Sequence, residues 1–318
     1  MATWKLTIRP DHKVGLDPFS LCRMESLVGA GWAYIFENKT IASKQDSYNA
    51  LVEAESKIPA AIKTLLDEVQ AGDFIWLHKG GEFFLCKIKD NECVLGPQIA
   101  DNFQEYDLGH GRNADWVKVS PLLVPGRVQR STIAQRMIQR ISSSDAQQRY
   151  FGYIHTELSK DPEFLPRVDE EEVAQELETI SPDQFVDLLG PDDCEGLVAA
   201  FLQAKGWTLI LSTAYKSKPM FEFTMVRPGP PPEYAHVQVK SGSVPLSPLD
   251  FKKFTSGGEC VFLFSTAPNP YPGEALDRVY TLNPKDVLGW AGKNAWALLP
   301  GVKLQLSLCY RIGSHAAH

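Results

Sequence analysis

The sequence lacks the paired cysteines and histidines that bind structural zinc. Its six cysteines include no CxxC pair, and its seven histidines show neither HxxxH nor HExxH spacing. Structural zinc sites use closely spaced ligand pairs of this kind. We therefore expect scattered, reduced and mostly buried thiols rather than a zinc-stabilised fold.

Long hydrophobic segments and a nucleotide-binding loop are missing as well. No apolar run approaches the ~20 residues that cross a bilayer, and the opening MATWKLTIRPDHK has no apolar segment typical of a secretion signal. No GxxxxGK[ST] pattern occurs, so we expect no P-loop nucleotide hydrolysis by this chain. The sequence predicts a cytoplasmic protein with no membrane association.

The chain also lacks an overall positive charge, because its formal net charge is −7. The charge is unevenly distributed. Residues 161–195 hold thirteen acidic residues and one arginine, a net of −12, so the remaining residues carry +5. Local patches rather than the total charge set the attraction to phosphates. The acidic total therefore does not exclude a nucleic-acid partner.

The length of 318 residues and the 44% hydrophobic content predict two globular domains. Residues 1–126 contain a helical stretch, SYNALVEAESKIPAAIKTLLDEVQ, followed by short strand-like runs with tight turns, which is typical of a small β-barrel. Residues 127–181 predict a polar helical linker. Residues 182–318 predict a helix, three strands, a helix and a strand around a mixed sheet. The predicted fold class is α/β (α+β) with two domains.

The segment FEFTMVRPGPPPEYAHVQVKSG, residues 221–242, predicts a hairpin around a proline-rich turn. A turn at the centre of that loop places Glu222 opposite Lys240 and Thr224 opposite Gln238. Because strand side chains alternate, these four share one face. The other face carries Phe223, Met225, Val237 and Val239. A glutamate among large apolar residues is costly to bury unless its charge is used.

A polar strand face can simply face solvent. Two features favour a site instead. The neighbouring runs WTLILSTA and CVFLFS are too apolar for an exposed sheet edge, and a predicted helix that begins near Glu195 directly precedes the hairpin. We therefore expect the first turn of that helix to reach the same cleft.

The order of these residues resembles the core of the PD-(D/E)XK nucleases. A helix with Glu195, a strand with Glu222 and a partner strand with Gln238, Val239 and Lys240 are similar to the Mrr-like type IV, modification-dependent restriction endonucleases. In those enzymes a QxK tripeptide often replaces (D/E)xK. The resemblance implies a restriction-endonuclease-like αβββαβ core and a Mg²⁺- or Mn²⁺-dependent endodeoxyribonuclease.

The resemblance covers about residues 182–290, and its residue types suit phosphodiester hydrolysis. It implies Glu222, Glu195, the Gln238 side chain and the Val239 carbonyl as metal ligands, since Mg²⁺ prefers oxygen ligands. Lys240 would orient the attacking water or stabilise the growing negative charge. The departure is Glu222, where the family usually has Asp, often before Gly. The longer arm moves the metal by about 1.5 Å, so a degenerate, binding-only core is the alternative.

The N-terminal part resembles PUA-superfamily domains of the EVE and ASCH kind. The resemblance rests on AGDFIWLHKGGEFFLCKI with GAGWAY upstream and ADWVKV downstream. Several such domains read modified bases, which in a duplex usually requires flipping the base into a pocket with aromatic stacking and edge hydrogen bonds. The candidate base-binding residues are Trp32, Tyr34, Trp76, Trp116 and Asp73. The alternative is that the tryptophans are core residues and Asp73 ends a turn.

Two groups of basic residues could follow a DNA backbone. The segment RVQRSTIAQRMIQRI, residues 127–141, holds four arginines and no acid, and predicts a helix with one basic face. A short helix after the hairpin adds two lysines. The candidate phosphate contacts are Arg127, Arg130, Arg136, Arg140, Lys252 and Lys253. The alternatives are a linker helix paired with the acidic segment, and lysines that face solvent.

Taken together, the resemblances imply a modification-dependent DNA endonuclease of antiphage defence. Its partner would be double-stranded DNA carrying modified bases. Cutting both strands needs two active sites, so a homodimer is expected. The alternative is a non-catalytic nucleic-acid-binding protein with a degenerate nuclease core.

Overall fold

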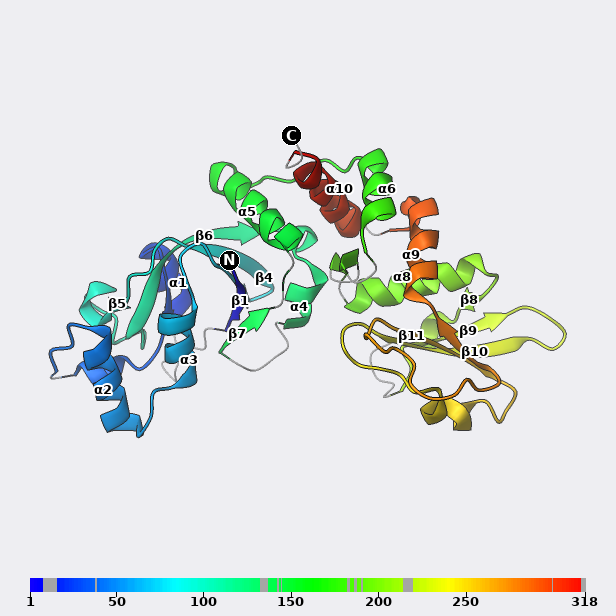
Figure 1. The fold of residues 1–318 in the computed structure, drawn as a ribbon, viewed down its shortest axis with the longest axis horizontal. Helices are drawn as coiled ribbons and strands as arrows, with labels where there is room; N and C mark the ends of the chain where they lie inside the picture. Colours follow the sequence, from blue (N-terminus) through cyan, green and yellow to red (C-terminus); the bar gives the residue numbers. More distant parts are fainter. Residues whose placement is uncertain are drawn as a thin grey trace. The chain divides into compact units, whose positions relative to one another are not determined.

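The computed structural model divides the chain into two compact units, Met1–Val124 with Ser131–Leu165 and Pro125–Arg130 with Pro166–His318. Each unit has its own sheet, so the mixed α+β, two-domain architecture is confirmed (Figure 1). Within the segment 127–181, residues 131–165 fall in the first unit and residues 127–130 and 166–181 in the second. The described residues are 1–7, 16–37, 39–131, 137–141, 143, 145–181, 184–185, 188–189, 191–213, 220–298 and 300–315.

The first unit is built on a curled seven-stranded sheet of order β2-β6-β4-β3-β1-β7, with β5 paired to β6. Strands β1 and β3 are parallel and the other pairs are antiparallel. Among the described strands, β2 and β7 end the path, so the sheet is open where the sequence predicts a barrel. The strands are β1 (Thr3–Leu6), β2 (Leu27–Ala30), β3 (Phe74–Lys79), β4 (Glu82–Ile88), β5 (Val94–Leu95), β6 (His110–Val119) and β7 (Ile138–Ile141).

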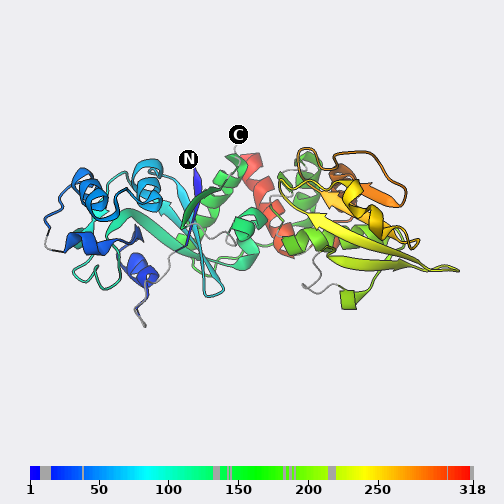
Figure 2. The same ribbon diagram turned by 90° about the horizontal axis from the view of Figure 1, so that it is seen from below.

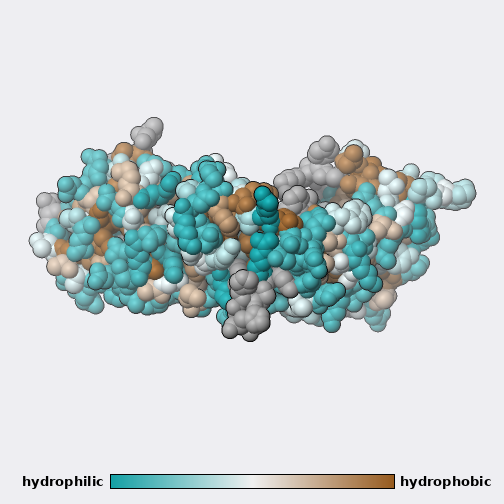
Figure 3. All heavy atoms as spheres, turned by 90° about the horizontal axis from the view of Figure 1, so that it is seen from above, coloured by the Kyte–Doolittle hydropathy of each residue, from teal (hydrophilic) through white to brown (hydrophobic). Residues whose placement is uncertain are grey.

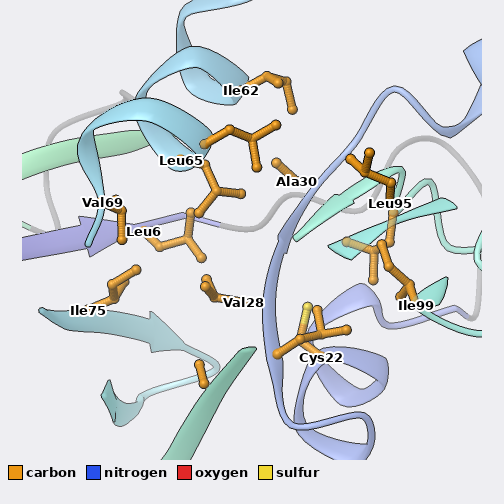
Figure 4. Packing of buried hydrophobic residues seen from close by; sticks show 14 of the residues in the cluster. Leu6, Cys22, Val28, Ala30, Ile62, Leu65, Val69, Ile75, Leu95 and Ile99 are labelled. Carbon is orange, nitrogen blue, oxygen red and sulfur yellow. The ribbon is translucent and has the colours of Figure 1, made fainter. Parts of the chain in front are cut away.

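Short helices cover this sheet and close its core. Figure 4 shows Leu6 of β1, Val28 of β2 and Ile75 of β3 converging with Ile62 and Leu65 of the covering helices. The predicted single helix after Ser47 is broken, because Ser56 is left-handed (φ 61°) and Pro59 follows. The helices are α1 (Pro18–Met24), η1 (Ala33–Phe36), α2 (Lys44–Glu55), α3 (Ala60–Lys63), η2 (Thr64–Glu68, a π-helix), η3 (Gly96–Gln98), η4 (Pro121–Leu123) and α5 (Asp145–Lys160).

The prediction of one arginine-rich helix over 127–141 is wrong. Helix α4 (Gly126–Ser131) covers only its start, and Ile138–Ile141 forms β7. Strand β7 pairs antiparallel with β1, placing Thr3 opposite Ile141. This pairing gives the backbone N–H and C=O groups at the edge of β1 their hydrogen-bond partners. Such contacts between distant segments outweigh the helical spacing of the apolar and basic residues in the segment.

The second unit is built on a mixed five-stranded sheet of order β12-β11-β10-β9-β8. Pairs β8·β9 and β9·β10 are antiparallel, whereas β10·β11 and β11·β12 are parallel. The predicted helix at SPLDFKKF is the 3-10 helix η6, and β12 adds a strand. The elements are α6 (Glu170–Thr179), α8 (Pro191–Ala204), β8 (Thr208–Leu209), η5 (Leu211–Thr213), β9 (Phe223–Arg227), β10 (Glu233–Lys240), η6 (Pro248–Phe254), β11 (Cys260–Ser265), β12 (Val279–Leu282), α9 (Pro284–Lys293), η7 (Ala295–Ala297) and α10 (Pro300–His315).

Two layers cover the sheet of the second unit. The back face, which we define by Val237 and Val239 of β10, packs with Val198 of α8 and Val287 of α9. The front face, which bears Gln238 and Lys240, is partly covered by η6 through Phe251. Figure 1 shows α8 and α9 on one side of this sheet and η6 on the other. Helices α6 and α10 lie side by side.

The face shown in Figure 3 is mainly hydrophilic, with apolar residues in scattered groups. A search of the described residues finds no helix with the length and hydropathy of a membrane span. All six cysteines are free thiols and four of them are buried, as the sequence predicts.

A buried histidine links α2 to the first sheet. His110 is fully buried; its Nδ1 lies 3.0 Å from the Gly31 carbonyl oxygen and its Nε2 lies 2.6 Å from Ser47 Oγ. A carbonyl oxygen only accepts, so Nδ1 carries the proton and Nε2 accepts from Ser47. Burial lowers the pKa of His110 to about 4, against the weaker opposing effect of its hydrogen bond to Gly31.

This histidine makes the stability of the first unit depend on pH. Its folded pKa of about 4 lies below the usual ~6.5. Its contribution is therefore fully present above the unfolded value and is lost as pH falls from about 6.5 towards 4. We expect about 2–3 kcal/mol less unfolding free energy at pH 4.5 than at pH 7.5 from His110 alone. Urea unfolding of the wild type and of His110→Gln at both pH values isolates this share, and an identical pH dependence in the two proteins would contradict it.

Candidate functional site

The β9–β10 hairpin brings the predicted polar residues together, with a different pairing from the predicted one. Thr224 lies opposite His236 rather than Gln238, a shift of two residues. The expectation that Glu222 lies directly opposite Lys240 is therefore wrong. Because side chains alternate with a period of two, this shift keeps the same residues on the same face.

The turn explains the shift. The ladder closes with Arg227 opposite Glu233, and the side chains of these two residues form an ion pair. The loop is therefore centred one residue earlier than the sequence suggests. Figure 2 shows the hairpin extending beyond the rest of its sheet.

Glu222 is the centre of the polar cluster. It lies directly before β9, and its Oε1 accepts a hydrogen bond of 3.0 Å from Gln238 Nε2 and another of 3.0 Å from Lys240 Nζ. The Glu222 side chain is 24% exposed and that of Lys240 is 41% exposed. A carboxylate, an amide and an ammonium thus meet at the surface of the front face, as the sequence predicts for these three residues.

Gln238 carries an unusual oxygen. The residue is 4% exposed, and its Oε1 is buried with no hydrogen-bond partner among the described residues. Because Nε2 donates to Glu222, Oε1 is directed elsewhere. An unpaired buried carbonyl oxygen costs about 1–3 kcal/mol, so this atom indicates a place for a water molecule or a cation.

The Val239 carbonyl is directed towards the same side of β10 as Glu222. The Thr266 amide donates to the Lys240 carbonyl, so the Lys240 carbonyl points to β11. Successive carbonyls of a strand point in opposite directions, so that of Val239 points to the β9 side. There the Glu222 amide donates to the Val237 carbonyl at 2.9 Å.

Glu195 is the fifth residue of α8, just after its first turn, and is partly exposed. Its helix packs on the back face through Val198, whereas Gln238 belongs to the front face. No group of three or more His, Cys, Asp or Glu side chains that could hold a metal ion occurs within the described ranges. A metal at this hairpin would thus depend on Glu222 and neutral oxygens, and the participation of Glu195 stays a prediction.

The sequence reasoning missed His236, which shares the front face. Its Nδ1 lies 3.2 Å from Thr224 Oγ1 and its Nε2 lies 3.2 Å from Glu259 Oε2. The ring of Phe221 stacks on it at 4.6 Å and 15°. This contact anchors the residue that precedes Glu222. The alternation in AHVQVK was the available signal, because it puts His236, Gln238 and Lys240 on one face.

The lysines of η6 lie beside this cluster. Lys252 and Lys253 are exposed, between Phe251 and Phe254. Both phenylalanines contact Phe221, at ring-centroid distances of 6.0 and 4.8 Å. The two lysines therefore belong to the element that covers the front face, and their exposed side chains are available to a polyanion.

The predicted arginines do not form one basic helix face. Arg127 lies in α4, which starts in the second unit, whereas Arg140 lies in β7 of the first unit with its guanidinium 5.9 Å from the Trp4 ring centroid. Arg130 falls in α4, but its side chain is outside the described part of the structure, and Arg136 lies outside the described residues altogether.

The four candidate base-binding aromatics lie in separate environments. Trp76 is 1% exposed and packs edge-on against Phe151 of α5. Trp32 is partly buried against the hydrophobic core of the first unit. The Tyr34 hydroxyl donates a hydrogen bond to the Glu55 carboxylate. Trp116 is partly exposed, and its Nε1 donates to the Leu27 carbonyl at 2.7 Å. Trp76 therefore has the role of a core residue, and only the other three present ring surface.

Asp73 is buried and fully engaged within the first unit. Its carboxylate accepts from the Ala2 amide at 2.6 Å, Trp4 Nε1 at 2.9 Å and the Gln70 amide at 3.1 Å. The residue is 3% exposed. These bonds tie β1 to the turn before β3, which is the structural alternative that the sequence left open.

Comparison with known proteins adds two similar solved structures. The DNA modification-dependent restriction endonuclease AspBHI is 11% identical, with a TM-score of 0.29, over 76% of this chain and 69% of that one. The MspJI restriction endonuclease in complex with a 27-mer oligonucleotide is 14% identical, with a TM-score of 0.20, over 96% of this chain and 75% of that one. No protein-family model and no curated protein matches the sequence. Similarity at this level identifies no family.

Proposed function

We propose that the chain is an endonuclease that hydrolyses DNA carrying modified bases, with its catalytic site on the front face of the second unit. The observation that carries the proposal is the convergence of Gln238 and Lys240 on one oxygen of Glu222, with a buried and unpartnered amide oxygen beside them. A structural salt bridge alone would leave the Gln238 oxygen unexplained.

The oxygen donors of this cluster fit a Mg²⁺ or Mn²⁺ ion. Such an ion prefers oxygen ligands and usually takes only one or two carboxylates from the protein. In this proposal Glu222, Gln238 Oε1 and the Val239 carbonyl hold it, with Glu195 as a second carboxylate. When bound, the ion polarises the phosphate and promotes ionisation of water.

The side chains around Glu222 have distinct tasks in this proposal. Lys240 Nζ is 3.0 Å from Glu222 Oε1 and 41% exposed on its side chain, so one ammonium can hold the carboxylate and donate to a phosphate oxygen or a water. Gln238 fixes the same carboxylate oxygen by its second hydrogen bond. Lys252 and Lys253 contribute phosphate contacts beside the site.

The first unit supplies DNA recognition in this proposal, as a reader of modified bases of the PUA-superfamily kind. The second unit is the Mrr-like PD-(D/E)XK core. The enzyme acts as a homodimer, because each site cuts one strand. Its biological role is restriction of foreign DNA in the cytoplasm.

A non-catalytic DNA-binding protein with a degenerate core is the second candidate. One observation favours it: both nitrogen donors contact Oε1 of the same glutamate, and the described residues hold no cluster of three metal-ligating acidic, histidine or cysteine side chains. In that case Lys240 neutralises Glu222 and the cluster is structural.

Incubation with DNA separates the two candidates. We expect strand cleavage of DNA carrying modified cytosines in Mg²⁺ or Mn²⁺, no cleavage of the same DNA without the modification, and no cleavage with a chelator. Gel analysis of the products and a binding assay are run in parallel. Binding of modified DNA without metal-dependent nicking would support the non-catalytic candidate instead.

A further inference from the structure

A groove of about 770 Å³ opens within the first unit, between the end of α1, strand β6 and α5. Its lining includes Ser20, Arg23, Ser26, Asp115, Trp116 and Lys118. This volume lies within the ~300–1,000 Å³ typical of sites for small organic ligands. We call it the Trp116 groove.

Trp116 provides a fixed aromatic wall in this groove. Its indole nitrogen donates to the Leu27 carbonyl, and Phe19 packs edge-on against the ring at 5.1 Å and 83°. The hydrogen bond and this contact hold the plane of the ring. Since Trp116 is partly exposed and lines the groove, the ring offers a preset stacking surface.

The charged side chains of the groove leave a positive excess. Asp115 is ion-paired with Lys89 at 2.7 Å, and Lys118 is ion-paired with Glu82. Arg23 is exposed, with its guanidinium 5.2 Å from the Phe84 ring centroid. Within the described part of the chain, no carboxylate forms an ion pair with it. Arg23 is thus the cation that remains to meet an anionic ligand.

We propose that the Trp116 groove binds one unstacked nucleotide of the DNA. The base stacks on Trp116 and a flanking phosphate pairs with Arg23. A base inside a duplex has no free face, so the nucleotide must leave the stack before it binds. An aromatic surface next to a cation is the combination that binds single nucleotides in this state. This inference rests on the proposed function, because it names the place where the first unit contacts the substrate.

The test measures DNA affinity of the full chain by fluorescence anisotropy, with a chelator present to prevent cleavage. The probe is a labelled duplex with one modified cytosine. We expect Trp116→Leu to weaken binding by about 10-fold or more, and Arg23→Glu by about 10-fold, with a salt dependence reduced by roughly one phosphate contact. Trp116→Phe, which keeps an aromatic ring, should retain most of the affinity.

Two matched controls come from residues outside the groove. Arg149→Glu makes the same charge change on the exposed surface of α5, and Trp296→Leu makes the same aromatic change at a residue that is 72% exposed in the second unit. Both should bind like the wild type. If Trp116→Leu and Arg23→Glu bind as these controls do, the inference is overturned while the proposed function stands. A wild type that binds no DNA would overturn both.

Discussion

We expect Glu222→Gln to abolish the proposed DNA cleavage and to leave DNA binding unchanged. The substitution keeps the shape of the side chain and removes the charge of the carboxylate on which Gln238 and Lys240 converge. Without that charge the cluster would lose the anionic ligand that the proposed function assigns to a divalent cation. We expect the single-turnover rate on modified DNA to fall by at least 10²–10³-fold, the size of effect seen when one preorganised electrostatic contact is removed. DNA binding is measured with the same duplex in the presence of a chelator.

The matched control for this prediction is Glu259→Gln. Glu259 Oε2 lies 3.2 Å from His236 Nε2, and the Glu259 side chain is 44% exposed. Glu259 is therefore a second carboxylate next to a residue of the front face, but it does not contact Lys240. We expect Glu259→Gln to change the single-turnover rate of cleavage by less than about 10-fold. Equal cleavage by Glu222→Gln and the wild type would remove Glu222 from the catalytic site and mean that another part of the chain cuts the DNA.

The front-face cluster could be predicted because strand alternation is local information. Any antiparallel pairing with the correct parity puts Glu222, Gln238 and Lys240 on one face, and the two-residue error in the predicted pairing did not change that outcome. The buried, unpartnered oxygen of Gln238 could not be predicted. Its burial depends on the tertiary packing over the front face, which strand alternation does not report.

The arginine segment shows the opposite case. Its spacing suits a helix, but its last residues pair with β1, whose other neighbour is β3. That position in the sheet is decided by residues more than a hundred positions away, which local periodicity does not report. The same pairing assigns Arg140 to the first unit and separates it from Arg127. The single basic helix face predicted for residues 127–141 therefore has no counterpart among the described residues.

Trp76 and Asp73 were ambiguous in the sequence for a related reason. A tryptophan in a small β domain suits both a core and a base pocket, and an aspartate before a strand suits both a turn and a ligand contact. Burial decides between these roles, and burial depends on the whole sheet. Trp76 is 1% exposed because α5 covers β3 through Phe151, and that helix lies beyond the predicted barrel.

Asp73→Ala should destabilise the first unit strongly. The carboxylate accepts hydrogen bonds from the Ala2 amide, Trp4 Nε1 and the Gln70 amide. Its removal leaves these donors without their acceptor at a site that is 3% exposed. Each buried, unsatisfied donor costs about 1–3 kcal/mol, so we expect a loss of about 3–5 kcal/mol in unfolding free energy. Urea unfolding of the full chain measures this loss when it is monitored by a spectroscopic signal that reports on the first unit.

This result also decides between the two roles of Asp73. Asp101→Ala, at an exposed position of the same unit, serves as the control and should change stability by less than about 0.5 kcal/mol. If Asp73 reads a base edge, its replacement by alanine lowers DNA affinity while stability stays close to that of the control. If it fastens β1 to the turn before β3, stability falls first, and DNA affinity measured on the remaining folded protein is unchanged. The three hydrogen bonds within the unit favour the second outcome, because a carboxylate that already accepts from two backbone amides and an indole has little capacity left for a ligand.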